Sequence, residues 1–278
     1  MQNLMKFMMS PKKLLILDRC HHLTAERLKL QKEFETKITK PDDKEALQNA
    51  NGLFIRTGVK VTESFLEKTP KLEVIVTATS GFDHIDVEAA NKKNIKVFFS
   101  PEGNIISAAE LTFAMVLSSF RKLRPADQMV RSGGWDREPL QGRELSQKTY
   151  GIIGLGRIGS KVSTFAKAFS MDVVAFDPYQ SDEAFEFAGA TRVGLTELLR
   201  ISDVISLHVP LTRETKRMLN IKTFSEMNPG VVIVNTSRGG VIDENDLLKA
   251  MDGKIVAAAA LDVFENLKVP WQKLTQRR

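Results

Sequence analysis

Residues 150–159 read Tyr150-Gly151-Ile152-Ile153-Gly154-Leu155-Gly156-Arg157-Ile158-Gly159, an apolar run followed directly by glycines in the spacing GxGxxG. A helical pattern over residues 160–169 comes next, and a second apolar run over residues 172–177 ends in Asp177. Glycines at this spacing allow a tight turn between strand and helix, and they let backbone N–H groups approach a pyrophosphate. The order of strand, glycine turn, helix, strand and acid therefore predicts a dinucleotide-binding βαβ unit.

The acid that ends the second strand predicts which dinucleotide binds. Asp177 is placed to accept hydrogen bonds from the ribose hydroxyls of adenosine, and its negative charge repels the 2′-phosphate of NADP. The predicted cofactor is therefore NAD. An alternative is that the glycines serve only close packing of the helix on the strand. The cofactor-binding candidates in this stretch are Gly154, Gly156, Arg157, Ile158, Gly159 and Asp177.

The rest of the chain alternates short apolar runs with amphipathic stretches, which is typical of parallel α/β folds. Strands are predicted over residues 13–18, 52–56, 72–77 and 96–99, and again over residues 149–154, 172–177, 203–209, 231–236 and 255–263. Helices are predicted over residues 24–34, 62–68, 86–93 (capped by Asp83) and 107–123, the last ended by Pro125. We expect two α/β domains, residues 1–103 and 104–278.

Two later predicted strands end in polar turns. One is followed by His208-Val209-Pro210-Leu211-Thr212, and the next leads into Asn235-Thr236-Ser237-Arg238-Gly239-Gly240. Ligands of open α/β sheets bind outside the carboxyl ends of the strands, so Arg238 is placed to meet an anion. Its planar guanidinium suits a carboxylate. The alternative for Arg238 is an ordinary solvated or ion-paired surface group.

Composition excludes several classes of function. The 278 residues are 42% hydrophobic and 27% charged, which supports a sizeable core and argues against wholesale disorder. The net charge of +6 comes without a basic stripe interleaved with aromatics, so nucleic-acid binding is not expected. No apolar run reaches about 18 residues, so no membrane-spanning helix is expected. The single cysteine, Cys20, fits a reducing cytoplasm. Cys20-His21-His22 is a cluster of possible metal ligands. It lacks a further ligand in view, so no metal site is expected.

Several motifs, in the same order along the chain, resemble those of the D-isomer-specific 2-hydroxyacid dehydrogenases. They are residues 154–159, Asp177, residues 208–212, residues 235–240 and Leu261-Asp262-Val263-Phe264. In detail, residues 55–56, 59–62, 107–110 and 177–179 are most similar to the phosphoglycerate-oxidising branch of that family. The resemblance implies an α/β protein with a flavodoxin-like substrate domain followed by a Rossmann-type, doubly wound NAD-binding domain.

The resemblance also implies an activity. A hydride would pass between the nicotinamide of NAD and C2 of a D-2-hydroxy acid that is 3-phosphoglycerate-like, or in reverse to hydroxypyruvate or glyoxylate. Arg238 would be catalytic, holding the substrate carboxylate and polarising the carbonyl. The substrate-binding residues implied are Arg56, Ser80, Gly81 and Asn104. The further cofactor contacts implied are His208, Val209, Pro210, Thr215, Thr236, Ser237, Arg238 and Asp262, the last holding the nicotinamide carboxamide.

The chain departs from the family pattern at its proton-handling residues. The family uses a histidine as general acid/base and a glutamate that raises its pKa. The glutamate position, five residues after Asp262, holds Leu267, and no histidine follows His208. We therefore expect a C-terminally truncated dehydrogenase, with a divergent tail over residues 266–278 and impaired turnover. The alternative is a non-catalytic NAD-binding relic or regulatory protein.

Three further expectations concern substrate and assembly. Thr77 stands where phosphoglycerate enzymes often carry a phosphate-binding arginine, which weakens the case for phosphate binding. His84 is expected to orient the Ser80 segment, and His208 to line the cofactor pocket, rather than to transfer protons. The helix over residues 107–123 matches one that helps to form a two-fold dimer in the family, which implies a homodimer.

Overall fold

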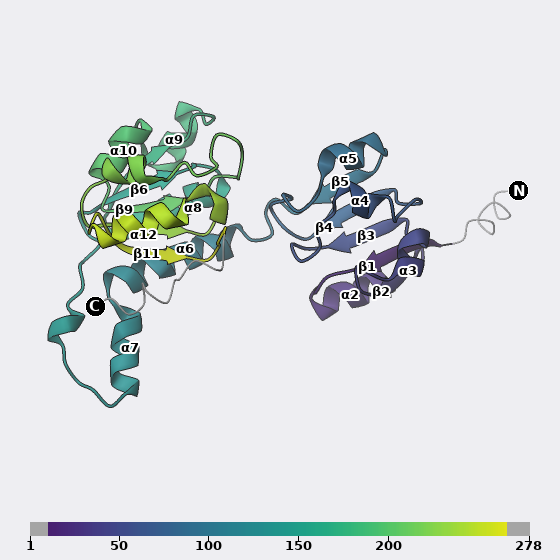
Figure 1. The fold of residues 1–278 in the computed structure, drawn as a ribbon, viewed down its shortest axis with the longest axis horizontal. Coiled ribbons are helices and arrows are strands. Elements are labelled where there is room, and N and C mark those ends of the chain that lie inside the picture. The colour runs from purple at the N-terminus through teal and green to yellow at the C-terminus, as the bar shows by residue number, and fades with distance from the viewer. Residues whose placement is uncertain (1–10, 266–278) are drawn as a thin grey trace, which may run out of the picture. The chain divides into compact units, whose positions relative to one another are not determined.

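The computed structural model describes residues 11–265. The chain divides into two compact units, Met1–Asn104 and Ile105–Arg278, and Figure 1 traces the ribbon of each. The predictions about the tail, including the departure at Leu267, lie outside the described residues.

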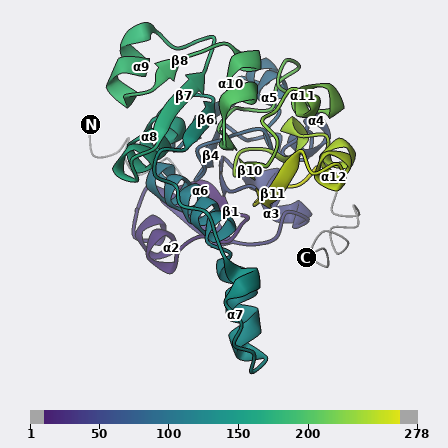
Figure 2. The same ribbon diagram turned by 90° about the vertical axis from the view of Figure 1, so that its left-hand side faces the viewer.

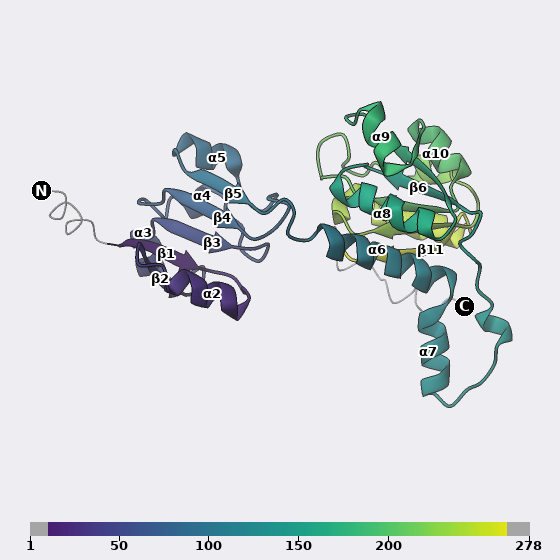
Figure 3. The same ribbon diagram turned by 180° about the vertical axis from the view of Figure 1, so that it is seen from behind.

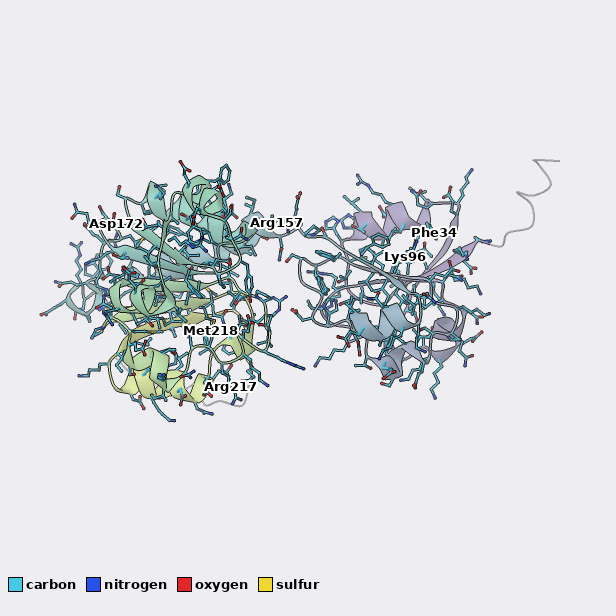
Figure 4. The ribbon with its side chains drawn as sticks, turned by 90° about the horizontal axis from the view of Figure 1, so that it is seen from above. Phe34, Lys96, Arg157, Asp172, Arg217 and Met218 are labelled. Carbon is cyan, nitrogen blue, oxygen red and sulfur yellow. The ribbon has the colours of Figure 1, made fainter. Side chains whose placement is uncertain are left out.

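The first unit is built on one parallel sheet. In its described part, five strands lie in the order β2-β1-β3-β4-β5, which is the flavodoxin-like order. Figure 4 labels Phe34 and Lys96, which begin the two edge strands. The strands are β1 (Lys12–Ile16), β2 (Phe34–Ile38), β3 (Gly52–Ile55), β4 (Val74–Thr77) and β5 (Lys96–Phe99). The helices are α2 (His22–Lys29), α3 (Lys44–Asn49), α4 (Glu63–Leu66) and α5 (Val87–Lys92).

The core of this unit follows from side-chain alternation along the strands. Leu15, Leu53 and Ile75 point to one face of the sheet and are buried there. Leu47 of α3 and Leu66 of α4 pack into the same cluster. The opposite face buries Leu14 and Ile16, in keeping with a parallel sheet that is apolar on both sides.

The second unit contains a larger parallel sheet. In its described part, six strands lie in the order β11-β10-β9-β6-β7-β8, so the first strand of the unit lies in the middle of the sheet. This is the doubly wound Rossmann order, and it confirms the predicted fold class. The order reverses between β6 and β9, which are hydrogen-bonded neighbours. The strands are β6 (Thr149–Ile153), β7 (Asp172–Phe176), β8 (Thr191–Arg192), β9 (Val204–Leu207), β10 (Val231–Asn235) and β11 (Val256–Leu261).

Helices cover both faces of the second sheet. One face carries α6 (Ile105–Phe120), α8 (Arg157–Ala168) and α9 (Asp182–Ala188), with α6 and α8 side by side (Figure 3). The other carries α10 (Leu195–Ile201), α11 (Ile221–Ser225) and α12 (Glu244–Asp252). Asp172 begins β7 and Arg157 follows β6, and Figure 4 shows them at opposite ends of the unit. The carboxyl ends of the strands therefore gather on the side of Arg157.

A helical arm projects from the second unit. It contains α7 (Leu123–Arg131) and the short 3-10 helix η1 (Glu138–Leu140), and Figure 2 shows α7 pointing away from the rest of the unit. No residue of α7 is buried, and the Trp135 side chain is 77% exposed. Neither this helix nor any other within residues 11–265 has the length and apolar character needed to span a bilayer.

Two predicted helices were wrong in their bounds. The helix expected over residues 24–34 ends at Lys29, because Phe34 starts edge strand β2. The helix expected to end at Pro125 breaks earlier, at Lys122, which adopts a positive φ of 50°. Pro125 instead lies in the first turn of α7, where a missing N–H costs no intrahelical hydrogen bond.

The predicted cap of α5 was also wrong. Asp86 rather than Asp83 caps this helix, since its carboxylate accepts the Ala89 N–H at 2.9 Å.

Candidate functional site

The glycine turn lies at the carboxyl end of β6, where the strand order reverses. Gly154 has a φ of +94°, and a Cβ there would lie 2.8 Å from the His208 carbonyl oxygen. A Cβ on Gly159 would lie 2.2 Å from the Gly154 carbonyl oxygen. Both positions therefore need glycine because the turn, α8 and the end of β9 are packed together.

Gly156 differs from the other two glycines. A Cβ there would meet no atom within 4 Å, and its φ of −76° is one that any residue adopts. Neither packing nor backbone conformation requires glycine at this position. The open space lies at the N-terminus of α8, which has no side-chain cap. Such a helix end favours an anion, so this turn fits the pyrophosphate of a dinucleotide.

Asp177 is joined directly to the glycine turn. Its carboxylate accepts the Leu155 N–H at 2.8 Å and the Tyr179 N–H at 2.9 Å. The Tyr179 hydroxyl in turn donates to Glu214 in the loop after β9, and this carboxylate raises the pKa of Tyr179. Loops after β7 and β9 thus meet beside the turn that follows β6. The acid is held where a ribose bound at this crevice would lie.

His208 is a neutral group at the same crevice. Its Nε2 lies 2.9 Å from the Ser206 hydroxyl, and burial lowers the pKa of His208 to about 4. Tyr150 is fully buried on neighbouring β6, and burial raises the pKa of its hydroxyl. At neutral pH the imidazole therefore presents a polar but uncharged surface.

The loop after His208 folds back on itself. Thr215 donates its hydroxyl to the Pro210 carbonyl and accepts the Thr212 N–H at 2.8 Å. Val209 is half-buried, with Cγ1 2.8 Å from the position of a Cβ on Gly154. Val209 thus lies beside the glycine turn, while Thr215 shapes the loop that carries Glu214.

Asn235 holds the turn that carries Arg238. Its buried side chain accepts the Ser237 N–H at 3.0 Å and the Ser237 hydroxyl at 2.8 Å. It also donates to the Arg238 carbonyl at 2.9 Å. The half-buried Arg238 side chain donates to the Ser237 carbonyl at 2.8 Å. Asp262 donates its N–H to the Asn235 carbonyl at 3.0 Å, so the end of β11 lies against the same turn.

Several supporting residues were not predicted from the sequence. Thr112 on α6 lies 2.7 Å from Thr236, hydroxyl to hydroxyl, which ties the turn to the helix. Gly239 excludes a side chain because a Cβ would lie 2.0 Å from the backbone of Phe264. Buried Glu244 accepts the Glu265 N–H at 2.6 Å. No signal in the sequence singled out Thr112, since α6 also contains Ser107, Ser118 and Ser119.

The predicted substrate residues lie in the first unit. Arg56 follows β3 and is exposed, whereas Ser80 and Gly81 follow β4 and are half-buried. The Ala78 N–H donates to the Ile55 carbonyl at 3.0 Å, so these two strand ends are adjacent. Asn104 is exposed at the end of this unit. Across residues 11–265, no group of His, Cys, Asp and Glu side chains is arranged to hold a metal ion.

Comparison with known proteins identifies the family. Residues 113–277 match the family model for the D-isomer specific 2-hydroxyacid dehydrogenase, NAD binding domain. D-3-phosphoglycerate dehydrogenase of Methanocaldococcus jannaschii is 42% identical over 91% of this chain and 49% of its own length. That of Bacillus subtilis is 42% identical over 81% of this chain and 43% of its own length. The chain thus spans about half the length of these curated relatives.

Solved structures share the fold. A D-lactate dehydrogenase from Aquifex aeolicus, complexed with NAD and lactic acid, matches with a TM-score of 0.84 and 34% identity, covering 95% of this chain and 81% of that one. A glyoxylate reductase from Paecilomyes thermophila matches with a TM-score of 0.87 and 26% identity, covering 97% and 86%. The second unit is therefore an NAD-binding domain, and the chain belongs to the D-isomer specific 2-hydroxyacid dehydrogenase family.

Proposed function

We propose that the second unit binds NAD with the pyrophosphate on the turn of residues 154–159 and the adenosine ribose on Asp177. The observation that carries this proposal is the open space at Gly156 beside a fixed carboxylate, at the point where the strand order reverses. The negative charge of Asp177 disfavours a 2′-phosphate, so NAD is preferred over NADP. Calorimetric titration with NADH and NADPH tests this, with tighter binding expected for NADH.

The proposed reaction interconverts a D-2-hydroxy acid and its 2-oxo acid. When bound, NAD supplies the nicotinamide that accepts or returns the hydride. Arg238 holds the substrate carboxylate and stabilises negative charge on the C2 oxygen. Asn235 fixes the backbone of that turn in advance, which lowers the cost of orienting the arginine. Asp262 holds the carboxamide of the cofactor, and Thr236 and Ser237 complete its contacts.

The proposed substrate is a small D-2-hydroxy acid of the 3-phosphoglycerate type, or hydroxypyruvate or glyoxylate in the reverse direction. The sequence relatives are phosphoglycerate dehydrogenases, and the structural relatives include lactate and glyoxylate enzymes. Arg56 and Lys60 are exposed near the end of β3 and would supply charge for a phosphate. Arg56, Asn104 and the amides of Ser80 and Gly81 form the substrate side. The assay follows the loss of NADH absorbance with one oxo acid at a time, and the acid that is reduced fastest identifies the substrate class.

A second candidate function is NAD binding without turnover. His208 favours it, since a half-buried imidazole with a pKa of about 4 is a poor proton carrier near neutral pH. The first unit holds the other three histidines of the chain, which are His21, His22 and His84. Of these, His84 is hydrogen-bonded to Thr77. NADH binding without consumption in the presence of hydroxypyruvate or glyoxylate would select this second function.

The proposal includes a cytoplasmic homodimer formed through residues 107–123. On α6, the Leu111 side chain is 40% exposed, whereas Phe113 and Val116 are buried in the core of their own unit. The outward face of α6 therefore retains apolar surface that a second copy would cover. Sedimentation velocity of the wild type and of Leu111→Glu tests the dimer, and a shift of the variant toward monomer is expected.

A further inference from the structure

Three polar side chains lie in line beneath the loop that follows β4. Thr77, the last residue of β4, is 0% exposed. Its hydroxyl oxygen lies 2.7 Å from that of Thr79 and 3.0 Å from Nε2 of His84. The Thr79 hydroxyl donates to the Gly81 carbonyl oxygen at 2.6 Å. These contacts form a line of hydrogen bonds from the His84 imidazole through the hydroxyls of Thr77 and Thr79 to the Gly81 carbonyl.

The carbonyl at the end fixes the direction of every hydrogen bond in the line. A carbonyl only accepts, so the single hydroxyl proton of Thr79 is committed to Gly81. Thr79 must then accept from Thr77, whose own proton is thereby used. Thr77 must accept in turn, so His84 donates from Nε2. The neutral His84 ring is therefore the tautomer that carries its proton on Nε2.

This line orients the peptide that joins Gly81 to Phe82. In a trans peptide the N–H points opposite to the C=O, so pinning the Gly81 oxygen inward turns the Phe82 N–H outward. Among the described residues, the N–H groups of Ser80, Gly81 and Phe82 donate to no protein acceptor. Three successive N–H groups without a protein acceptor leave donors that an anion can use.

The ends of the loop are held independently. The Thr79 carbonyl accepts the Ser100 N–H at 3.1 Å, and the His84 carbonyl accepts the Val61 N–H at 2.8 Å. The Ile85 N–H donates to the Phe82 carbonyl at 2.9 Å. These backbone bonds fix where the loop begins and ends. Within residues 11–265, the Thr79 hydroxyl alone holds the Gly81 carbonyl and so sets the orientation of that peptide.

We propose that Thr77, Thr79 and His84 are positioning residues for substrate. Their hydrogen-bonded line turns the Phe82 N–H outward. There it binds the carboxylate of the 2-oxo or 2-hydroxy acid together with the N–H groups of Ser80 and Gly81. The inference rests on the proposed function for the identity of the anion. It adds that the affinity for that carboxylate depends on a hydroxyl that does not itself touch substrate.

The test is oxalate binding to the full chain, measured by calorimetry with and without saturating NADH. Thr79→Val keeps the shape of the side chain but removes the hydroxyl, whereas Thr79→Ser retains the hydroxyl. We expect oxalate affinity to fall at least about tenfold in Thr79→Val and to stay within about twofold in Thr79→Ser. NADH affinity is expected to match the wild type in both variants. The melting temperature is expected to fall by a few degrees in Thr79→Val only, because that variant loses two hydrogen bonds.

A second measurement tests the line without any ligand. Nitrogen-15 spectra of the histidine rings distinguish the two neutral tautomers, and His84 is expected as the Nε2–H form in the wild type. Equal oxalate binding in the wild type and Thr79→Val, or equal losses in the valine and serine variants, would overturn the proposal, as would an Nδ1–H ring. An absence of NADH binding with intact, Thr79-dependent oxalate binding would instead overturn the cofactor role of the second unit.

Discussion

Leu155 donates its backbone N–H to the Asp177 carboxylate at 2.8 Å, so the glycine turn after β6 and the acid after β7 are directly bonded. The two features that predicted a dinucleotide site are therefore one structural unit. The carboxylate has two roles in this account: one oxygen fixes the turn, and the charge selects the cofactor.

Variants of Asp177 separate those roles. Asp177→Asn keeps an oxygen that can accept from Leu155 but loses the charge, so it is expected to improve NADPH binding with a small loss for NADH. Asp177→Ser shortens the side chain as well, and NADH affinity is expected to fall about tenfold while NADP tolerance improves. Fluorescence titration with both cofactors measures the preference. An unchanged NADH-to-NADPH ratio in both variants would contradict the role of Asp177.

Alanine substitutions distinguish the glycines by their surroundings. Gly159→Ala places a Cβ 2.2 Å from the Gly154 carbonyl, and the backbone must shift. We expect the free energy of unfolding to drop by about 3 kcal/mol. A Cβ on Gly156 meets no atom within 4 Å, so Gly156→Ala should cost at most about 1 kcal/mol, from the weaker N-cap of α8. Urea unfolding measures both, and equal losses would show that the turn is packed differently.

Asn235 is predicted to be the main support of the Arg238 turn. Asn235→Ala removes three hydrogen bonds in a buried place and leaves the Arg238 carbonyl with the longer bond from the Val241 N–H at 3.3 Å. We expect a loss of about 3 kcal/mol in the free energy of unfolding, together with weaker oxalate binding. Ser237→Ala is the matched control, since it removes only the hydroxyl bond and should cost about 1 kcal/mol. Unfolding curves that do not separate the two variants would argue against this support.

The half-buried His208 predicts a dependence of stability on pH. Its pKa is about 4 in the folded chain and 6.5 in an unfolded one, so the unfolded state binds more protons between these values. Stability should therefore fall as pH drops from 6.5 towards 4, by up to about 3 kcal/mol from this group. His208→Asn should flatten that part of the profile, while His22→Asn, at an exposed position, should not. The midpoint of urea unfolding, measured for the wild type and both variants at several values from about pH 4.5 to about pH 7, tests this dependence.

Local patterns in the sequence predicted the second sheet well. The strands that end at Ile153, Phe176 and Asn235 are apolar and buried on both faces, so their periodicity and bounds were readable. Edge strand β2 was missed because its residues Phe34–Ile38 are almost all exposed and carry no apolar run. Its pairing with β1, not its composition, makes it a strand.

Contacts between distant residues could not be predicted from the sequence. Thr112 and Thr236 are 124 residues apart in the chain, and only the packing of α6 on the end of β10 joins them. The line from His84 to Gly81 is shorter in sequence, yet its direction depends on hydroxyl geometry that no spacing rule contains. The glycine motif likewise gave no indication that Gly156 alone of its three glycines is free of packing constraints.

Cofactor binding at the glycine turn is tested by a calorimetric titration of the chain with NADH, comparing the wild type with Gly156→Val. The larger side chain would occupy the open space at the N-terminus of α8, which the fold itself does not fill. We expect saturable binding by the wild type and at least about a tenfold weaker binding by the variant, with a folded variant whose melting temperature falls by only a few degrees. No saturable binding by the wild type, or equal binding by both proteins, would contradict cofactor binding at this turn.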